Sequence, residues 1–340
     1  MRSFLCALVL TPILRDIFRS YNVVDRPGGR KAHAYPIPRL GGIAIAVAYL
    51  FALLYLDTDG EQAWRILPGA GLIFLTGILD DFFELSARYK LLGQIIAAMI
   101  AYWADMRMPG SVWVSFPVTI LWLLFTTNSF NLIDGLNGLC SGLGLISTLT
   151  LFYLGYTHGS MELQIATLPL AGALLGFLCF NFSRATIFLG DSGALLVGFL
   201  IGSFVLLWSG SIPGETFDGS LLDRIIRAAP VMALFIPLLE VVLSVIRRFL
   251  SRKPIFAADR GHIHHRLLDR GLSPMQVVLV MYAWSGIGAV LGVLLAGRPP
   301  QPWPWVLGTA FVAIVILGIW QLRYAEFQTA LERLWRRQEG

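Results

Sequence analysis

The chain has 340 residues, of which 56% are hydrophobic and only 14% are charged. Soluble globular domains carry roughly 25% charged residues, so this composition excludes a water-soluble globule. The 26 Lys and Arg exceed the 21 Asp and Glu, which gives a formal net charge of +5. No nucleic-acid partner is expected. The three cysteines lie inside apolar runs without a paired spacing, which argues against a disulfide framework or a zinc site.

Uncharged apolar runs follow one another along the chain. A bilayer span needs about 20 apolar residues, and its backbone must form its own hydrogen bonds, so each run is expected to be a helix. The run 3–14 is interpreted as a signal anchor or first span, because no small-residue cleavage site follows it. The other runs are 40–56, 66–79, 91–104, 108–133, 135–161, 163–183, 192–214, the Pro-interrupted 225–250, 271–297 and 299–322.

These runs predict an all-α fold, a polytopic transmembrane bundle of about ten or eleven helices. Residues 1–322 are expected to form a single transmembrane catalytic domain, and residues 323–340 a basic cytosolic tail. Most Lys and Arg residues fall in the loops after odd-numbered helices, which the positive-inside rule places in the cytosol. The polar residues described next share that side.

The first polar feature is a pair of adjacent carboxylates, Asp80 and Asp81, at the end of an apolar run. Adjacent like charges raise each other's pKa, so the pair favours a nearby cation or proton donor. A solvated helix end is the alternative. Lys90 begins the next run, where it could reach a lipid phosphate, and snorkelling of an interfacial lysine is the alternative.

A second group of polar side chains interrupts the longest apolar part of the chain: Asn128, Asn131, Asp134 and Asn137. Asn and Asp supply the oxygen ligands that Mg²⁺ prefers, and the glycines between them permit close approach of a ligand. A polar turn between helices is the alternative. Asp191 begins another apolar run on the same side, where an ordinary helix N-cap is the alternative.

The segment 259–266 is rich in cationic and imidazole side chains: Arg260, His262, His264, His265 and Arg266. Histidines at this spacing can bind a transition metal, but the arginines make an anion such as pyrophosphate the better fit. A solvated basic loop is the alternative. Glu240, inside the preceding apolar run, is an intramembrane carboxylate that needs a partner.

Clustered carboxylates imply a hard divalent cation, and the neighbouring Arg and His residues imply a phosphate. The combination predicts a magnesium-dependent enzyme that performs phosphoryl transfer on a phosphorylated lipid at the cytosolic membrane surface. An ion-coupled transporter would instead spread such residues over broken, repeated helices, and no internal repeat is visible. A CDP-alcohol phosphotransferase would need an Asp-Gly-x-x-Ala-Arg type of motif, which Asp134-Gly135 does not begin.

Five motifs follow one another in a fixed order. They are Arg30-Lys31-Ala32-His33 with Pro38-Arg39-Leu40-Gly41-Gly42, Leu79-Asp80-Asp81, Asn131-Leu132-Ile133-Asp134-Gly135, Phe188-Leu189-Gly190-Asp191-Ser192-Gly193, and His262-Ile263-His264-His265-Arg266. In order and spacing, the chain resembles the polyprenyl-phosphate N-acetylhexosamine-1-phosphate transferases, of the bacterial undecaprenyl-phosphate GlcNAc-1-phosphate transferase type in glycosyltransferase family 4. The resemblance implies that a UDP-sugar, typically UDP-N-acetylglucosamine, donates its sugar 1-phosphate to undecaprenyl phosphate and leaves UMP.

The resemblance also implies residue roles. Asp80, Asp81 and Asp134 would be catalytic, Asp191 and Asn131 would bind Mg²⁺ (or Mn²⁺ in its place), and Lys90 would hold the lipid phosphate. The nucleotide sugar would be bound by Asn137, Phe188, His262, His264, His265 and Arg266. Many members carry Asp where this chain has Asn137, and the missing charge argues against a catalytic base there.

The setting implied by the resemblance is the bacterial inner membrane, with the active site on the cytosolic face and membrane lipid, the UDP-sugar and undecaprenyl phosphate as partners. A homodimer is one option for its assembly. The product would enter O-antigen, teichoic acid or common-antigen synthesis. The related phospho-N-acetylmuramoyl-pentapeptide transferase, the alternative within the superfamily, usually shows three consecutive histidines and an acidic segment, which the run from His262 to Arg266 lacks.

Overall fold

The computed structural model describes residues 1–26, 35–56, 63–211, 228–252, 261–297 and 303–321, and these residues form twelve α-helices. The helices are α1 (Arg2–Ser20), α2 (Gly42–Tyr55), α3 (Leu67–Phe83), α4 (Ala87–Trp103), α5 (Val112–Ile133), α6 (Leu139–Thr157), α7 (Met161–Asn181), α8 (Gly190–Ser211), α10 (Phe235–Leu250), α11 (Ile263–Asp269), α12 (Pro274–Ala296) and α13 (Trp303–Gln321). Short 3₁₀ turns, η1 (Ala63–Ile66) and η3 (Ala229–Met232), precede α3 and α10. The predicted helical bundle is confirmed.

Among the described helices, six are long and apolar enough to cross a bilayer: α3 together with η1, α5, α6, α7, α8 and α12. The polytopic membrane architecture is therefore confirmed. The run 225–250 differs from the single element expected, because α10 begins only at Phe235, after η3. Pro230 lies in η3, and a proline has no N–H with which to continue a regular helix.

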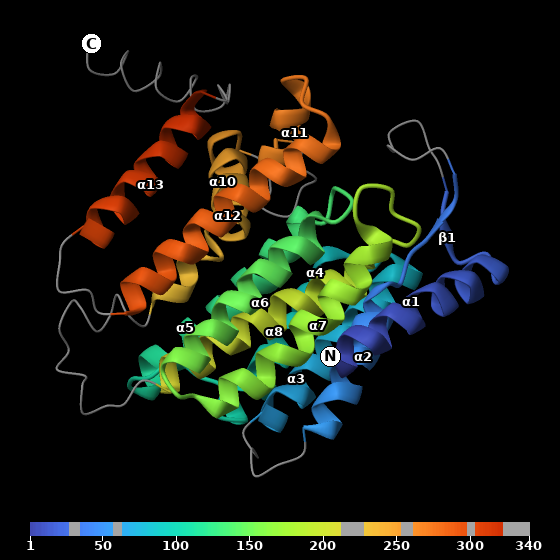
Figure 1. The fold of residues 1–340 in the computed structure, drawn as a ribbon, viewed down its shortest axis with the longest axis horizontal. Coiled ribbons are helices and arrows are strands. Elements are labelled where there is room, and N and C mark those ends of the chain that lie inside the picture. The colour runs from blue at the N-terminus through green and yellow to red at the C-terminus, as the bar shows by residue number, and fades with distance from the viewer. Residues whose placement is uncertain (27–34, 57–62, 212–227, 253–260, 298–302, 322–340) are drawn as a thin grey trace.

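Helix α8 forms the centre of the bundle, and its residues 192–209 are all buried. A helix that is apolar on every side is stable only where neighbours cover all of its faces. Helices α2, α3, α5 and α6 pack around it. Figure 1 shows α8 in the middle of the bundle, with α1 and α2 on one side and α10, α12 and α13 on the other.

Glycines allow α2 and α3 to approach α8 at backbone distance. A Cβ atom added at Gly42 would overlap the backbone nitrogen of Gly193, and one added at Gly77 would overlap the Cα of Ser192. Any side chain at these positions would push α8 away, because protein interiors leave no free space for it. The start of α2 and the end of α3 are thus held against the first turn of α8.

The structure adds one element that the all-α prediction did not include, an antiparallel ladder of two short strands. Strand β1 (Val24–Asp25) pairs with β2 (Ile37–Pro38). The chain after β2 then bonds to the loop before α8, since Phe188 donates its N–H to Pro38 over 2.8 Å and Gly41 donates to Phe188 over 2.9 Å. These bonds fix the loop that leads into α8.

Some predicted features lie outside the described residues. They are the motif Arg30-Lys31-Ala32-His33, the residues Asp259 and Arg260, and the tail 323–340. The division of the chain into a catalytic domain over 1–322 and a basic tail stays a prediction.

We expect Gly77→Ala to lower the melting temperature of the detergent-purified protein, because the new Cβ would overlap the backbone of Ser192. Overpacking of this kind costs about 1–3 kcal/mol. The matched control is Gly71→Ala on the same helix, where nothing lies within 4 Å of the added Cβ. This control should keep or raise the melting temperature, since Ala is favoured over Gly in a helix by about 1 kcal/mol. Equal changes in the two variants would show that the contact between α3 and α8 is not tight.

Candidate active site

Lys90, in the first turn of α4, lies between two carboxylates that come from different helices. Its Nζ is 2.6 Å from Oδ2 of Asp80 at the end of α3, and 2.7 Å from Oδ1 of Asp191 at the start of α8. Asn131, in the last turn of α5, donates its side-chain amide to the same oxygen of Asp191. The structure therefore brings these predicted site residues together from four helices.

Asp81 points in another direction and holds the start of α8. Its two carboxylate oxygens accept the backbone N–H of Asp191 over 2.9 Å and that of Ser192 over 3.0 Å. The first N–H groups of a helix have no partner inside the helix, and the positive end of the helix dipole favours a negative charge. Asp81 is 5% exposed. Its carboxylate therefore caps α8, whereas that of Asp80 faces Lys90.

Asp134 and Asn137 lie in the turn between α5 and α6. Burial raises the pKa of Asp134 well above its ordinary value, and the nearby carboxylates of α8 and α3 raise it further. Asn137 donates its amide to the carbonyl of Ser183 over 3.1 Å, which ties this turn to the loop before α8. Phe188, half-buried, lies in that loop. A carboxyl group whose pKa is raised beside other acids is a typical candidate for proton transfer.

The predicted donor-binding histidines lie at the start of α11 and reach the same turn. His262 and His264 are buried, and His265 and Arg266 are half-buried. The ring of His264 lies against Gly135, since a Cβ atom added there would be 2.6 Å from its Nε2. The histidine segment therefore contacts the turn between α5 and α6.

His264 differs from the cationic group that its sequence context suggests. Burial, together with the positive charges of His265, His262 and Arg247, lowers the pKa of His264 to about 3. Near pH 7 the imidazole of His264 is therefore neutral in the free protein. It offers hydrogen bonds to a ligand rather than a positive charge.

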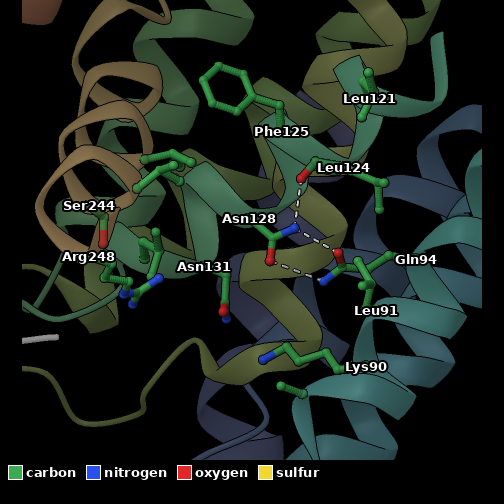
Figure 2. A pocket seen from close by; sticks show the side chains of 14 residues that line it. Lys90, Leu91, Gln94, Leu121, Leu124, Phe125, Asn128, Asn131, Ser244 and Arg248 are labelled. Atoms are coloured by element: carbon green, nitrogen blue, oxygen red, sulfur yellow. Dashed lines mark hydrogen bonds between the residues drawn. The ribbon is translucent and has the colours of Figure 1, made fainter. Parts of the chain in front are cut away.

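A cavity of about 460 Å³ lies beside Lys90, between α4, α5 and α10. Pockets for small ligands usually measure about 300–1,000 Å³. In Figure 2, Lys90 and Asn131 lie toward one end of the cavity, and Leu121 and Phe125 lie toward the other. Further apolar side chains line its walls: Ala87, Leu91, Leu124, Leu132, Val241 and Val245. The cavity thus joins a charged end to an apolar body.

Sequence reasoning assigned no role to three polar residues of this cavity, Gln94, Ser244 and Arg248, and it counted Asn128 among the possible magnesium ligands. Figure 2 shows the amide pair of Gln94 and Asn128, in which Asn128 Nδ2 is 2.7 Å from Gln94 Oε1 and the return bond measures 3.4 Å. Polar cavity residues recur one helical turn apart on each helix, a spacing visible in the sequence. The pairs are Lys90 and Gln94, Asn128 and Asn131, and Ser244 and Arg248.

The residues present suit a magnesium ion better than a metal enclosed by protein ligands. Within the described ranges, no group of three His, Cys, Asp or Glu side chains is arranged to hold a metal. Mg²⁺ usually takes one or two protein carboxylates and completes its shell with water and substrate phosphates. Asp191 and Asn131 carry oxygen atoms of the kind that such a partial site uses, and in this structure Asn131 donates its N–H to Asp191.

The fold and the site together define an integral membrane enzyme, with a carboxylate–lysine centre at the charged end of an apolar cavity. A model of glycosyl transferase family 4 matches residues 63–209. A probable undecaprenyl-phosphate N-acetylglucosaminyl 1-phosphate transferase of Bacillus subtilis is 35% identical over 308 residues, which cover 86% of this chain and 83% of that protein. The chain belongs to glycosyl transferase family 4, and it is a glycosyl-1-phosphate transferase.

Two further relatives agree with this assignment. A decaprenyl-phosphate N-acetylglucosaminephosphotransferase of Mycolicibacterium smegmatis is 32% identical over 335 residues, or 88% of this chain and 82% of that protein. An undecaprenyl-phosphate alpha-N-acetylglucosaminyl 1-phosphate transferase of Escherichia coli O157:H7 is 26% identical over 367 residues, or 99% and 95%. The family expected from the motifs is confirmed, while the roles of single residues stay predictions.

We expect Asp80→Asn and Asp81→Asn to fail in different ways. Asp81→Asn places an N–H donor against the backbone N–H groups of α8, and a lost N-cap costs about 0.5–2 kcal/mol, so it should lower both the melting temperature and the activity. Asp80→Asn should lower turnover by roughly 100-fold or more with little change in stability. Thermal unfolding and turnover of both purified variants test this, and the reverse pattern would contradict the division of roles.

His264 should make the protein sensitive to acid. Its folded pKa of about 3 lies below the ordinary value of 6.5, so the unfolded chain takes up a proton first, and stability falls as the pH drops below 6.5. At pH 5.0 the loss amounts to about 2 kcal/mol. We expect His264→Asn, which cannot take up that proton, to lose less melting temperature than the wild type between pH 7.5 and pH 5.0. Equal losses would mean that His264 is charged in the folded protein.

Proposed function

We propose that this protein transfers a sugar 1-phosphate from a UDP-sugar to a polyprenyl phosphate and releases UMP. The observation that carries the proposal is the position of Lys90, whose ammonium group lies 2.6 Å from Asp80 and 2.7 Å from Asp191 beside an apolar cavity. A lipid with a phosphate head requires this combination of a cation and an apolar channel. The printed names of the relatives describe transfer to polyprenyl phosphates.

The acceptor would lie in the cavity between α4, α5 and α10, with its phosphate at Lys90. Leu121 and Asn131 both line the cavity from α5, and ten residues of helix span about 15 Å. The walls can therefore follow the first part of a polyprenyl chain. Arg248 brings a second cation to the cavity from α10, which supports an anionic occupant.

The donor would lie where the turn after α5 meets α11. Asn137 and Phe188 would contact the nucleoside, and the segment from His262 to Arg266 would meet the diphosphate or the sugar. The contact of His264 with Gly135 supports this assignment, because it joins the two segments. A neutral His264 would supply hydrogen bonds, and Arg266 would supply charge.

In the proposed reaction, a phosphate oxygen of the lipid attacks the sugar-bearing phosphorus, and the bond from that phosphorus to the UMP oxygen breaks. Asp80 would take the proton of the acceptor phosphate, since its carboxylate lies on the lysine that holds that phosphate. Asp134, whose pKa is raised, is the second candidate for proton transfer. Phosphoryl transfer depends mainly on alignment and charge stabilisation, so Asp81 would contribute by fixing the start of α8.

Magnesium is the proposed cofactor, with Mn²⁺ as a substitute, and Asp191 and Asn131 would hold it. When bound, the ion would neutralise diphosphate charge and stabilise the leaving UMP.

The names of the relatives favour N-acetylglucosamine as the sugar. The same names favour undecaprenyl or decaprenyl phosphate as the acceptor. These names favour an N-acetylhexosamine over a muramoyl-pentapeptide donor, and family membership favours a transferase over an ion-coupled transporter. The inner membrane is proposed as the location, with the site on its cytosolic face, because the positive-inside rule places most Lys and Arg residues of the sequence on the side of the site motifs. We also propose that the protein forms a homodimer and that its product enters O-antigen, teichoic acid or common-antigen synthesis.

We expect the detergent-purified protein to release UMP when it receives undecaprenyl phosphate, Mg²⁺ and UDP-N-acetylglucosamine. A panel of other UDP-sugars tests the donor, and EDTA should stop the release because it removes the cation. Release of UMP that needs both the lipid and Mg²⁺ would support the reaction.

A matched variant tests the acceptor site in the same assay. Lys90→Gln removes the charge and leaves a polar side chain that is one atom shorter, so the KM for undecaprenyl phosphate should rise more than the KM for the UDP-sugar. A folded wild-type protein that releases no UMP from any donor would contradict the proposed function. A change confined to the donor KM would mean that Lys90 has been assigned to the wrong substrate.

A further inference from the structure

Glu240, on α10, is a carboxylate with no exposed surface that meets the start of the histidine segment. The exposed fraction of Glu240 is 0%. Its Oε1 lies 2.7 Å from Nδ1 of His262, and the backbone N–H of Ile263 donates to Oε1 over 2.9 Å and to Oε2 over 3.0 Å. A buried carboxylate is strongly unfavourable unless hydrogen bonds satisfy its oxygens. Glu240 and the first residues of α11 therefore depend on one another.

The bond to Glu240 determines which nitrogen of His262 carries a hydrogen. An ionised carboxylate can only accept hydrogen bonds, so we assign the hydrogen to Nδ1. The remaining ring nitrogen, Nε2, then carries a lone pair and can accept a hydrogen bond from a substrate. A carboxylate behind a histidine commonly fixes the tautomer and the orientation of the ring in this way.

The same contact sets the position of the other histidines. The rings of His262 and His264 are parallel with centroids 5.5 Å apart, and those of His264 and His265 are 4.3 Å apart. A second residue of α10, Arg247, lies against Gly261, because a Cβ atom added at Gly261 would be 2.7 Å from its Nε. Glu240 and Arg247 are seven residues apart, which places them on one face of α10. This face of α10 contacts the start of the histidine segment, and His264 of that segment contacts the turn after α5.

We propose that Glu240 is a positioning residue for the donor: it holds His262 so that Nε2 accepts a hydrogen bond from a hydroxyl or N–H group of the nucleotide sugar, and it fixes the histidine segment over the α5–α6 turn. The inference rests on the proposed function. Other residues of α10, Val241 and Val245 among them, line the cavity proposed for the lipid. Disruption of the whole helix would therefore weaken the binding of both substrates. Loss of the bond from Glu240 to His262 weakens the binding of the nucleotide sugar.

The test uses the full-length enzyme, with each substrate varied while the other is saturating. Glu240→Gln removes the charge and one acceptor, and it should raise the KM for the UDP-sugar roughly tenfold while the KM for undecaprenyl phosphate changes less than about twofold. The control is Ser285→Ala, which removes a buried hydrogen bond of 3.0 Å to Ala233, just before α10. This control should lower the melting temperature without changing the donor KM.

Variants of His262 separate its two nitrogens. The amide of His262→Asn approximates Nδ1 and that of His262→Gln approximates Nε2, so His262→Asn keeps the bond to Glu240 but loses the proposed donor contact. Adding Glu240→Gln to His262→Asn should then raise the donor KM by less than Glu240→Gln does alone, because only the contact through Ile263 is left to weaken. If Glu240→Gln does not yield folded protein, His262→Gln breaks the same bond with the carboxylate in place, and it is measured in the same way.

The outcomes distinguish this inference from the proposed function. A donor KM that rises alone, together with non-additive effects in the double variant, supports Glu240 as a positioning residue. An unchanged donor KM, equal changes for both substrates, or additive effects overturn it while leaving the proposed function intact. A folded wild-type protein that releases no UMP overturns both.

Discussion

The centre depends on the contact between the end of α3 and the start of α8. Gly77 lets the two backbones touch, and the carboxylate of Asp81 accepts the N–H groups of Asp191 and Ser192. The first N–H groups of a helix have no partner inside the helix, so the carboxylate of Asp81 satisfies two groups that would otherwise lack one. With α8 held at this height, Asp191 meets Lys90 of α4 and Asn131 of α5. The meeting of four helix ends therefore follows from one interhelical contact.

Asp80 and Asp81 are adjacent in sequence but serve different purposes because of helix geometry. Successive residues of an α-helix are rotated by about 100° around its axis, so the two neighbouring carboxylates leave the helix in different directions. Asp80 is directed to Lys90, and Asp81 is directed to the start of α8. The pair thus links the reactive centre to the packing of the bundle, and a change at either position reaches the site by a different route.

The sequence was sufficient to predict the helical bundle and to predict that the site residues lie on the same side of it. Long apolar runs specify spans through length alone, and the motif residues Asp80, Lys90, Asn131 and Asp191 do meet. The cap made by Asp81, the pairing of Glu240 with His262 and the cavity beside α10 could not be predicted. Each depends on which helices become neighbours, and periodicity within one helix carries no information about the next. The neutral state of His264 was missed for a related reason, since it results from burial of the ring and from the charges of His265, His262 and Arg247.

The charge of the centre explains why its parts are coupled. Lys90 carries one positive charge among the carboxylates of Asp80, Asp81, Asp134 and Asp191, so an approaching phosphate would meet excess negative charge. The pKa of Asp134 is raised by burial and by the neighbouring carboxylates, so this carboxyl group holds its proton more tightly than an exposed one. A positive charge brought to Asp191 would oppose that shift, because it would stabilise the charged form of Asp134. Binding of a cation and loss of a proton from Asp134 would therefore favour one another.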